Sequence, residues 1–204
     1  GLWVAIAGSL LSLLLAALLG IWVFVAAVIG LVFAWIYSMP PLRLKQDGWQ
    51  GNAAVGLSYE TLPWLTAVAA ATNGLPDWRT GLIALLYGLG AHGIMTLNDF
   101  KAIEGDRQMG IRSLPARYGP QAAARLACLT MAFAQLAVVA ALLAWGRPVF
   151  AAAIAGLTLV QLVCMARFLK DPIARAVWYS AIGVGLYVTG MVIAAFALRG
   201  LVSA

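Results

Sequence analysis

The chain has 204 residues, of which 64% are hydrophobic and 10% are charged, and its net charge is +6. A soluble domain is roughly half apolar and a quarter charged, so this composition indicates an integral membrane protein. Nucleic-acid binding is a poor interpretation of the positive charge, because no soluble basic domain is present. The stretch from Leu10 to Leu19 is continuously apolar rather than alternating, which excludes an outer-membrane β-barrel.

Apolar segments separated by polar or glycine-containing connections predict transmembrane helices, since about 20 apolar residues in a helix span the hydrocarbon core. A lipid-facing backbone must also satisfy its own hydrogen bonds, which favours helices. The seven segments, in chain order, cover residues 1–19, 21–38, 53–72, 81–98, 122–145, 149–169 and 176–198. We therefore expect an all-α seven-helix bundle that forms a single membrane-embedded domain over residues 1–204.

The polar connections differ between the two sides of the predicted bundle. The longer ones, 39–52, 99–121 and 170–175, fall on one side, which carries ten basic residues: Arg43, Lys45, Lys101, Arg107, Arg112, Arg117, Arg125, Arg167, Lys170 and Arg175. The other side carries three, Arg79, Arg147 and Arg199. Because basic residues are retained on the cytoplasmic side of a membrane, we expect the longer connections to face the cytoplasm.

Two ionisable residues lie within the apolar segments. A carboxylate inside a membrane is costly, so Glu60 is a candidate functional residue, with a neutral, internally bonded side chain as the alternative. His92 is the only histidine and precedes Asp99 by seven residues, which puts both on about the same helix face, with His92 about 10 Å deeper. A hydrogen bond to a neighbouring helix is the simplest structural role for His92.

The densest polar cluster is NDFKAIEGDR, residues 98–107, which holds three of the seven acids. If the helix continues through it, Asp99 and Asp106 share a face, whereas Glu104 points elsewhere unless Gly105 ends the helix. Converging carboxylates suit Mg²⁺, which proteins hold with one or two carboxylates plus substrate phosphate oxygens. A solvated helix end with weak surface ion pairs is the alternative.

Basic residues flank this cluster. Arg107 and Arg112 follow the acids, and Arg43 and Lys45 lie in the other long connection on the same side. Arginine and lysine next to metal-binding acids suit a diphosphate group. Contact with anionic lipid head groups is the alternative for any one of them.

Two longer motifs carry a family resemblance. Residues 98–119, NDFKAIEGDRQMGIRSLPARYG, resemble the second aspartate-rich motif of the UbiA-type prenyltransferase superfamily, and within it the chlorophyll and bacteriochlorophyll synthases. Residues 37–52, YSMPPLRLKQDGWQGN, are similar to a second signature of the same branch. The order of the helices around both motifs fits the last seven of the nine transmembrane helices of that family.

The resemblance implies transfer of a phytyl or geranylgeranyl group from its diphosphate to the propionate carboxylate of chlorophyllide or bacteriochlorophyllide. It also implies a multi-pass protein in the inner membrane of a phototrophic bacterium, and leaves room for association with other membrane proteins of pigment biosynthesis. The substrates would be a prenyl diphosphate and a tetrapyrrole carboxylic acid, with Mg²⁺ as cofactor.

The resemblance also assigns roles to single residues. Asp99 and Asp106 would be the catalytic acids that face the metal, with Glu104 as a third. Positions inside the apolar segments, and not the resemblance, make His92 a candidate to ligate the central metal of the tetrapyrrole or bind its substituents, and Glu60 a candidate substrate contact. The residues that would bind the diphosphate are Arg43, Lys45, Arg107 and Arg112.

Two departures from the family pattern affect the metal site. Ala102 stands where many members carry an acid, and no N-D-x-x-D-x-x-x-D motif precedes the first segment. We therefore expect the working protein to extend upstream of Gly1 by two helices and to carry that first aspartate-rich motif there. Prenylation of a quinone precursor or haem, and a transporter that uses Glu60 and His92, remain as alternative functions.

Overall fold

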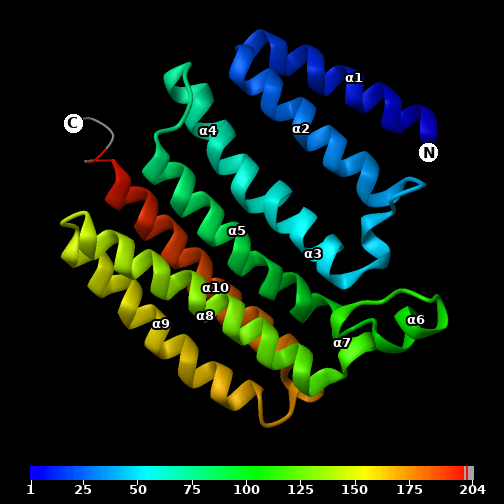
Figure 1. The fold of residues 1–204 in the computed structure, drawn as a ribbon, viewed down its shortest axis with the longest axis vertical. Coiled ribbons are helices and arrows are strands. Elements are labelled where there is room, and N and C mark those ends of the chain that lie inside the picture. Colours follow the sequence, from blue (N-terminus) through cyan, green and yellow to red (C-terminus); the bar gives the residue numbers. More distant parts are fainter. Residues whose placement is uncertain (200, 202–204) are drawn as a thin grey trace.

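The computed structural model describes residues 1–199 and 201, and its regular elements there are helices that lie side by side as a bundle (Figure 1). Six of these helices are long and apolar enough to cross a membrane. They are α1 (Leu2–Leu19), α2 (Ile21–Ser38), α5 (Trp78–Asp99), α8 (Pro120–Ala144), α9 (Pro148–Phe168) and α10 (Pro172–Leu198). The predicted all-α membrane architecture is confirmed.

The remaining predicted span is a helical rod in three parts: α3 (Gly48–Gly56), the π-helical turn η2 (Leu57–Thr61) and α4 (Leu62–Thr72). Pro63 has no N–H to donate to Tyr59, and its ring crowds the preceding turn, which accounts for the local widening to a π-turn. The rod begins earlier than the predicted residue 53, because Asp47 caps the amides of Trp49 and Gln50 at its start.

The tightly packed part of the molecule is the four-helix block of α5, α8, α9 and α10. Gly90 in α5 faces the Tyr187 ring of α10, and Gly93 faces the backbone oxygen of Ala127 in α8. The missing side chains therefore permit close helix packing, as small residues do in membrane bundles.

Buried polar groups connect the helices of this block. Gln135 in α8 donates to Gln161 in α9 at 2.5 Å, and Gln161 donates to the Tyr179 hydroxyl of α10 at 3.2 Å. The Tyr187 hydroxyl donates to the carbonyl oxygen of Tyr87 at 2.9 Å. All of these side chains are fully buried, so the hydrogen bonds satisfy groups that lipid could not.

The N-terminal hairpin of α1 and α2 lies at one edge of the bundle, where α2 packs against α4 (Figure 1). Only 6% of the most apolar window of each helix is buried inside the protein. Their exposed leucines, valines and isoleucines suit contact with lipid.

Candidate active site

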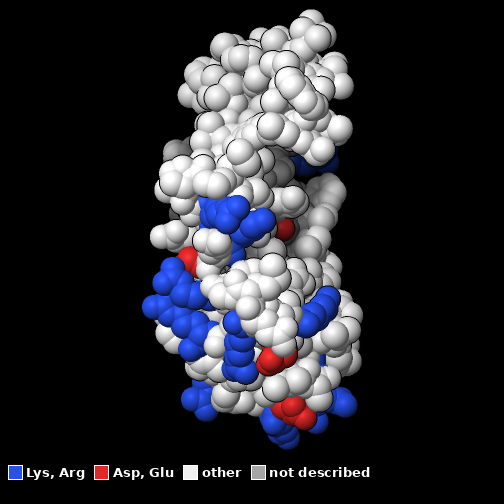
Figure 2. All heavy atoms as spheres, turned by 90° about the vertical axis from the view of Figure 1, so that its right-hand side faces the viewer, with Lys and Arg blue, Asp and Glu red and all other residues white. Residues whose placement is uncertain are grey.

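The two longest connections meet at one end of the bundle. The first contains the short helix η1 (Leu44–Gln46), and the second contains α6 (Ile103–Gln108) and α7 (Leu114–Tyr118). Figure 2 shows that lysine and arginine side chains gather over this end, whereas the N-terminal hairpin above them is uncharged. The polar chemistry of the chain is therefore concentrated where these connections touch.

A polar cavity of about 550 Å³ lies between the two connections. Its cationic wall is formed by the first connection, which contributes Arg43 and Lys45, and its acidic wall by α5 and α6, which contribute Asp99 and Asp106. The cavity is also lined by Tyr37, Gln46, Asp47, Gly48, Gly51, Asn52, Met95, Met109, Ile111 and Ser113. The structure thus brings four of the predicted site residues to one cavity.

Asp99 and Asp106 reach this cavity from different helices. The two acids do not lie on one continuous helix, because α5 ends at Asp99, next to the predicted segment end at residue 98, and α6 begins at Ile103. The amides of Phe100, Lys101 and Ala102 bond to carbonyls three residues back, which tightens the turn and changes its phase. The two carboxylates nevertheless line the same space.

Glu104 and Arg107 lie on the outside of α6. Both are exposed, and neither lines the polar cavity. The Glu104 carboxylate accepts a hydrogen bond from Gln108 at 3.1 Å. Gly105 lies within α6 and does not end it, and Glu104 is turned away from the cavity that Asp99 and Asp106 line.

Arg43 adopts an unusual backbone conformation at the rim of the cavity. Its φ of 42° and ψ of 56° lie in the left-handed region, which costs a residue with a side chain about 1–2 kcal/mol. Strain of this kind persists where surrounding structure imposes it, and it is frequent at functional sites. Here it turns the chain into η1, so that Arg43 and Lys45 line the same cavity.

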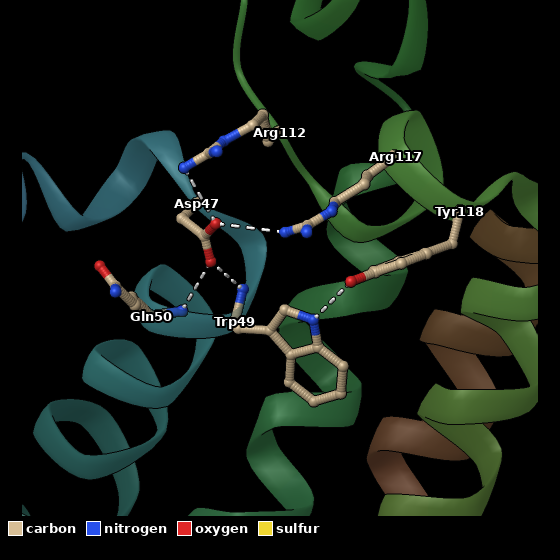
Figure 3. A network of polar contacts seen from close by, with 6 residues as sticks. All are labelled: Asp47, Trp49, Gln50, Arg112, Arg117 and Tyr118. Atoms are coloured by element: carbon tan, nitrogen blue, oxygen red, sulfur yellow. Dashed lines mark hydrogen bonds and ion pairs between the residues drawn. The ribbon is translucent and has the colours of Figure 1, made fainter.

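Arg112 is engaged by an acid instead of lining the cavity. Its guanidinium lies 3.3 Å from the Asp47 carboxylate, which Arg117 also approaches at 3.5 Å. Figure 3 shows both arginines pointing at Asp47 from the second connection. Asp47 was not among the predicted site residues, although an aspartate beside two arginine-bearing segments is a signal that could have suggested an ion pair.

Asn52 is a second residue that sequence analysis missed. Its amide donates to Thr96 at 3.2 Å, and Asn52 lines the polar cavity together with Asp99. Asn52 is buried at the point where α3 crosses α5. An amide at the start of an apolar segment was the available signal.

A larger, mostly apolar cavity of about 800 Å³ lies between α2, the α3–η2 rod and α5. It shares Tyr37 and Met95 with the polar cavity, so the two spaces adjoin. Glu60, on the π-turn η2, lines this apolar cavity, which places the intramembrane carboxylate beside a space of substrate size.

His92 is buried next to Trp49 instead of lining either cavity. The ring centroids of His92 and Trp49 are 5.3 Å apart, and the His92 side chain is 7% exposed. Among the described residues, neither of its ring nitrogens has a partner with good hydrogen-bond geometry. Trp49 of α3 lies beside the ring, and His92 does not line the polar cavity that Asp99 reaches two turns further along α5.

Comparison with known proteins identifies the family. The UbiA prenyltransferase family matches residues 1–182. The chain belongs to this family. A solved structure of a digeranylgeranylglyceryl phosphate synthase in membranes has the same fold, with a TM-score of 0.67 and 22% identity over 94% of this chain and 67% of that one.

Several characterised members of the UbiA family are similar over most of the chain. The bacteriochlorophyll synthase 33 kDa chain of Cereibacter sphaeroides is 51% identical over 98% of this chain and 67% of its own length. That of Rhodobacter capsulatus is 50% identical with the same coverage, and the chloroplastic chlorophyll synthase of Avena sativa is 39% identical over 96% of this chain and 53% of its own. The chain is thus a multi-pass membrane prenyltransferase, and the transporter interpretation is excluded.

The polar cavity of this UbiA prenyltransferase suits a divalent metal only if a bound substrate supplies some of the coordinating oxygens. In the described part of the chain no group of three or more His, Cys, Asp or Glu residues could hold a metal by itself. Asp99 and Asp106 supply two carboxylates, and Arg43 and Lys45 suit an anion. This arrangement fits Mg²⁺ bound jointly by one or two carboxylates and phosphate oxygens.

Proposed function

We propose that this chain forms most of an enzyme that transfers a phytyl or geranylgeranyl group from its diphosphate to the propionate carboxylate of chlorophyllide or bacteriochlorophyllide. The observation that carries the proposal is the pair of adjoining cavities, one polar with opposed charges and one apolar and larger. A prenyl diphosphate has the same division into a charged head and an apolar tail. The high identity to bacteriochlorophyll synthases supports a tetrapyrrole acceptor rather than a quinone precursor or haem.

In this proposal the polar cavity binds the diphosphate. Arg43 and Lys45 neutralise its oxygens by charge-assisted hydrogen bonds. Asp99 and Asp106 would hold Mg²⁺ against the same group, and the metal would supply further neutralisation of the leaving diphosphate. Arg107 and Arg112, which lie outside the cavity, reach the donor only if the connections move, so Arg43 and Lys45 carry most of the direct contact.

The apolar cavity then governs the transfer. The bond between the first prenyl carbon and the diphosphate oxygen breaks, and the electron pair leaves with the diphosphate. The acceptor carboxylate attacks the resulting allylic cation and forms the ester bond. Apolar lining residues such as Phe33, Ala54 and Val55 exclude water, which would otherwise yield the free prenyl alcohol.

Glu60 and His92 have different places in this scheme. Glu60 lines the apolar cavity and would contact the acceptor there. His92 is buried beside Trp49 and lines neither cavity, so ligation of the central metal of the tetrapyrrole requires a rearrangement that exposes His92. Replacing His92 with Phe tests this role, because an unchanged absorption spectrum of bound tetrapyrrole would rule out ligation.

We also propose how the coordination of the metal is completed. Two cavity carboxylates leave a diphosphate with few metal ligands, and Asp47 is already taken up by two arginines. Within residues 1–204, which we propose form one membrane-embedded domain, the remaining metal ligands would come from water and from the phosphate oxygens of the donor.

The charge distribution supports an active site on the cytoplasmic side, and the similarity to bacteriochlorophyll synthases supports the inner membrane of a phototrophic bacterium as its location. Ten basic residues lie on the side of the long connections and three on the other. Labelling of a cysteine introduced at exposed Met109, from either side of sealed vesicles, measures this orientation.

The decisive experiment uses membranes that contain the full-length protein. These are incubated with Mg²⁺, one tetrapyrrole acid and one prenyl diphosphate at a time, and products are identified by mass spectrometry. We expect a phytyl or geranylgeranyl ester of chlorophyllide or bacteriochlorophyllide. Prenylation of a quinone precursor or haem, without any tetrapyrrole ester of this kind, would refute the proposal.

A further inference from the structure

The carboxylate of Asp47 uses both oxygens for contacts within the protein. Oδ1 accepts hydrogen bonds from the amides of Trp49 at 3.0 Å and Gln50 at 3.3 Å, which caps α3. Oδ2 lies 3.3 Å from Nη2 of Arg112 and 3.5 Å from Nη1 of Arg117 (Figure 3). A carboxylate occupied in this way has little capacity left for a metal ion or a substrate donor.

The backbone around Asp47 is paired with the second connection as well. The amide of Gly48 donates to the Arg112 carbonyl, and the amide of Arg112 donates to the Gln46 carbonyl, both at 2.9 Å. A Cβ atom at Gly48 would lie 2.6 Å from the backbone nitrogen of Leu114. Only glycine therefore lets the two connections approach so closely.

This contact joins the two walls of the polar cavity. Arg43 and Lys45 lie just before Asp47 in the chain, and Asp106 lies just before Arg112. In the described residues, the ion pairs between the two connections are those made by Asp47. The ion pairs of Asp47 therefore act together with the backbone hydrogen bonds beside it to hold the two connections against each other.

The two arginines differ from Arg43 and Lys45 in their exposure. The side chain of Arg112 is 65% exposed and that of Arg117 is 42% exposed, whereas that of Asp47 is 15% exposed. Neither arginine lines the polar cavity. An isolated exposed ion pair contributes little, but two arginines here meet one shielded carboxylate that also caps a helix.

We propose that Asp47 is a positioning residue that sets the distance between the two walls of the diphosphate site, and that Arg112 and Arg117 act through it without contacting the donor. The proposal rests on the proposed function and deepens it, since it divides the basic residues into those that bind and those that hold the loop. Because Asp47 keeps its cap when replaced by asparagine, its charge can be tested apart from the helix.

The test is a double-mutant cycle in the full-length enzyme with Asp47→Asn, Arg112→Gln and the double variant. Binding of inorganic pyrophosphate with Mg²⁺ is measured by the shift in thermal unfolding, and the KM for the prenyl donor is measured alongside kcat. Each single variant should weaken pyrophosphate binding and raise the donor KM roughly tenfold, the size expected for a lost charge-assisted contact. The double variant should be no worse than Asp47→Asn alone, because that substitution already removes the contact to Arg112.

Lys170→Gln is the matched control, since Lys170 is an exposed cation on the same side of the bundle and far from the cavity. It should leave both constants unchanged. If Asp47→Asn folds poorly, the cycle is repeated with Arg112→Gln and Arg117→Gln, which are exposed and should again show a shared loss.

Normal pyrophosphate affinity in Asp47→Asn, or losses that multiply in the double variant, would overturn the positioning role. Multiplying losses would instead make Arg112 an independent donor contact. A failure of the proposed function looks different, because the wild-type enzyme would then bind pyrophosphate but form no tetrapyrrole ester.

Discussion

The four-helix block and the N-terminal hairpin are built from similar amino acids but packed in different ways. In α5, 61% of the most apolar window is buried inside the protein, compared with 6% in α1 and in α2. The block contains buried glutamines and tyrosines that bond across helices, whereas the uncharged hairpin exposes most of its apolar side chains. Mean hydropathy alone therefore does not distinguish a helix that faces lipid from one that faces protein.

The difference in packing between the four-helix block and the N-terminal hairpin explains where the cavities form. The apolar cavity lies where α2 of the hairpin faces α3, η2 and α5, and the polar cavity lies at the end of this same boundary. The block supplies a closely packed surface, and the hairpin supplies a wall with little of its surface buried inside the protein. An enzyme for long lipid-like donors needs such a boundary, since the substrate must enter from the membrane.

The largest effect that we expect is a loss of catalytic rate without a loss of stability. Asp99→Asn and Asp106→Asn should each lower the rate of prenyl transfer by at least about 100-fold, because each removes a charge that would hold the metal against the diphosphate. Membrane insertion and the midpoint of thermal unfolding should stay near those of the wild type, as neither residue belongs to the packed core. Product formation is followed by mass spectrometry, and wild-type turnover by both variants would contradict the metal assignment.

Adding one methyl group to each region probes the packing difference directly. Gly90→Ala would collide with Tyr187 inside the block and should reduce the free energy of unfolding by about 1–3 kcal/mol. Gly8→Ala in α1 has no atom within 4 Å of the new Cβ, so it should change stability little. Unfolding in detergent is compared for the two variants. Equal losses would show that the hairpin is packed as tightly as the block.

Filling part of the apolar cavity should lower kcat/KM for the prenyl donor more than it lowers the stability of the fold. Ser58→Phe projects into the apolar cavity, so kcat/KM for the geranylgeranyl donor should fall roughly tenfold, the cost of losing a good fit for part of the tail. Leu57→Phe is its control, since Leu57 is exposed on the same rod and does not line the cavity. Identical kinetics for the two variants would argue that the tail binds elsewhere.

The smallest effect concerns the buried hydrogen bonds of the block. Gln135→Leu removes the contacts to Gln161 and Thr158 and should lower stability by about 0.6–2 kcal/mol, the range for interhelical hydrogen bonds in membranes. The unfolding midpoint in detergent measures this change, with Thr189→Val as control because Thr189 is exposed and bonds only within α10 among the described residues. A gain in stability would mean that the network costs more than it contributes.

Much of the fold could be predicted from the sequence because spans in a membrane obey simple rules. Helix α1 ends just before Gly20, which adopts a φ of 123°. Helix α2 ends just before Met39, where the apolar segment stops. The long helices α8, α9 and α10 all begin at a proline, which tolerates the first helical position because its absent N–H needs no partner there. Each of these signals is local, so neighbouring helices do not change it.

The candidate site was also predictable from the sequence only in part. The residue types and spacings in segments 37–52 and 98–119 were enough to indicate a family and a diphosphate site. They could not show that a separate helix begins at Ile103 and carries Asp106, or that Asn52 donates to Thr96 and lines the same cavity as Asp99. They also could not show that Arg112 meets Asp47. Those facts depend on how two connections pack against each other across the end of the bundle, where segments distant in the chain come within hydrogen-bonding distance and their relative geometry leaves no trace in local periodicity.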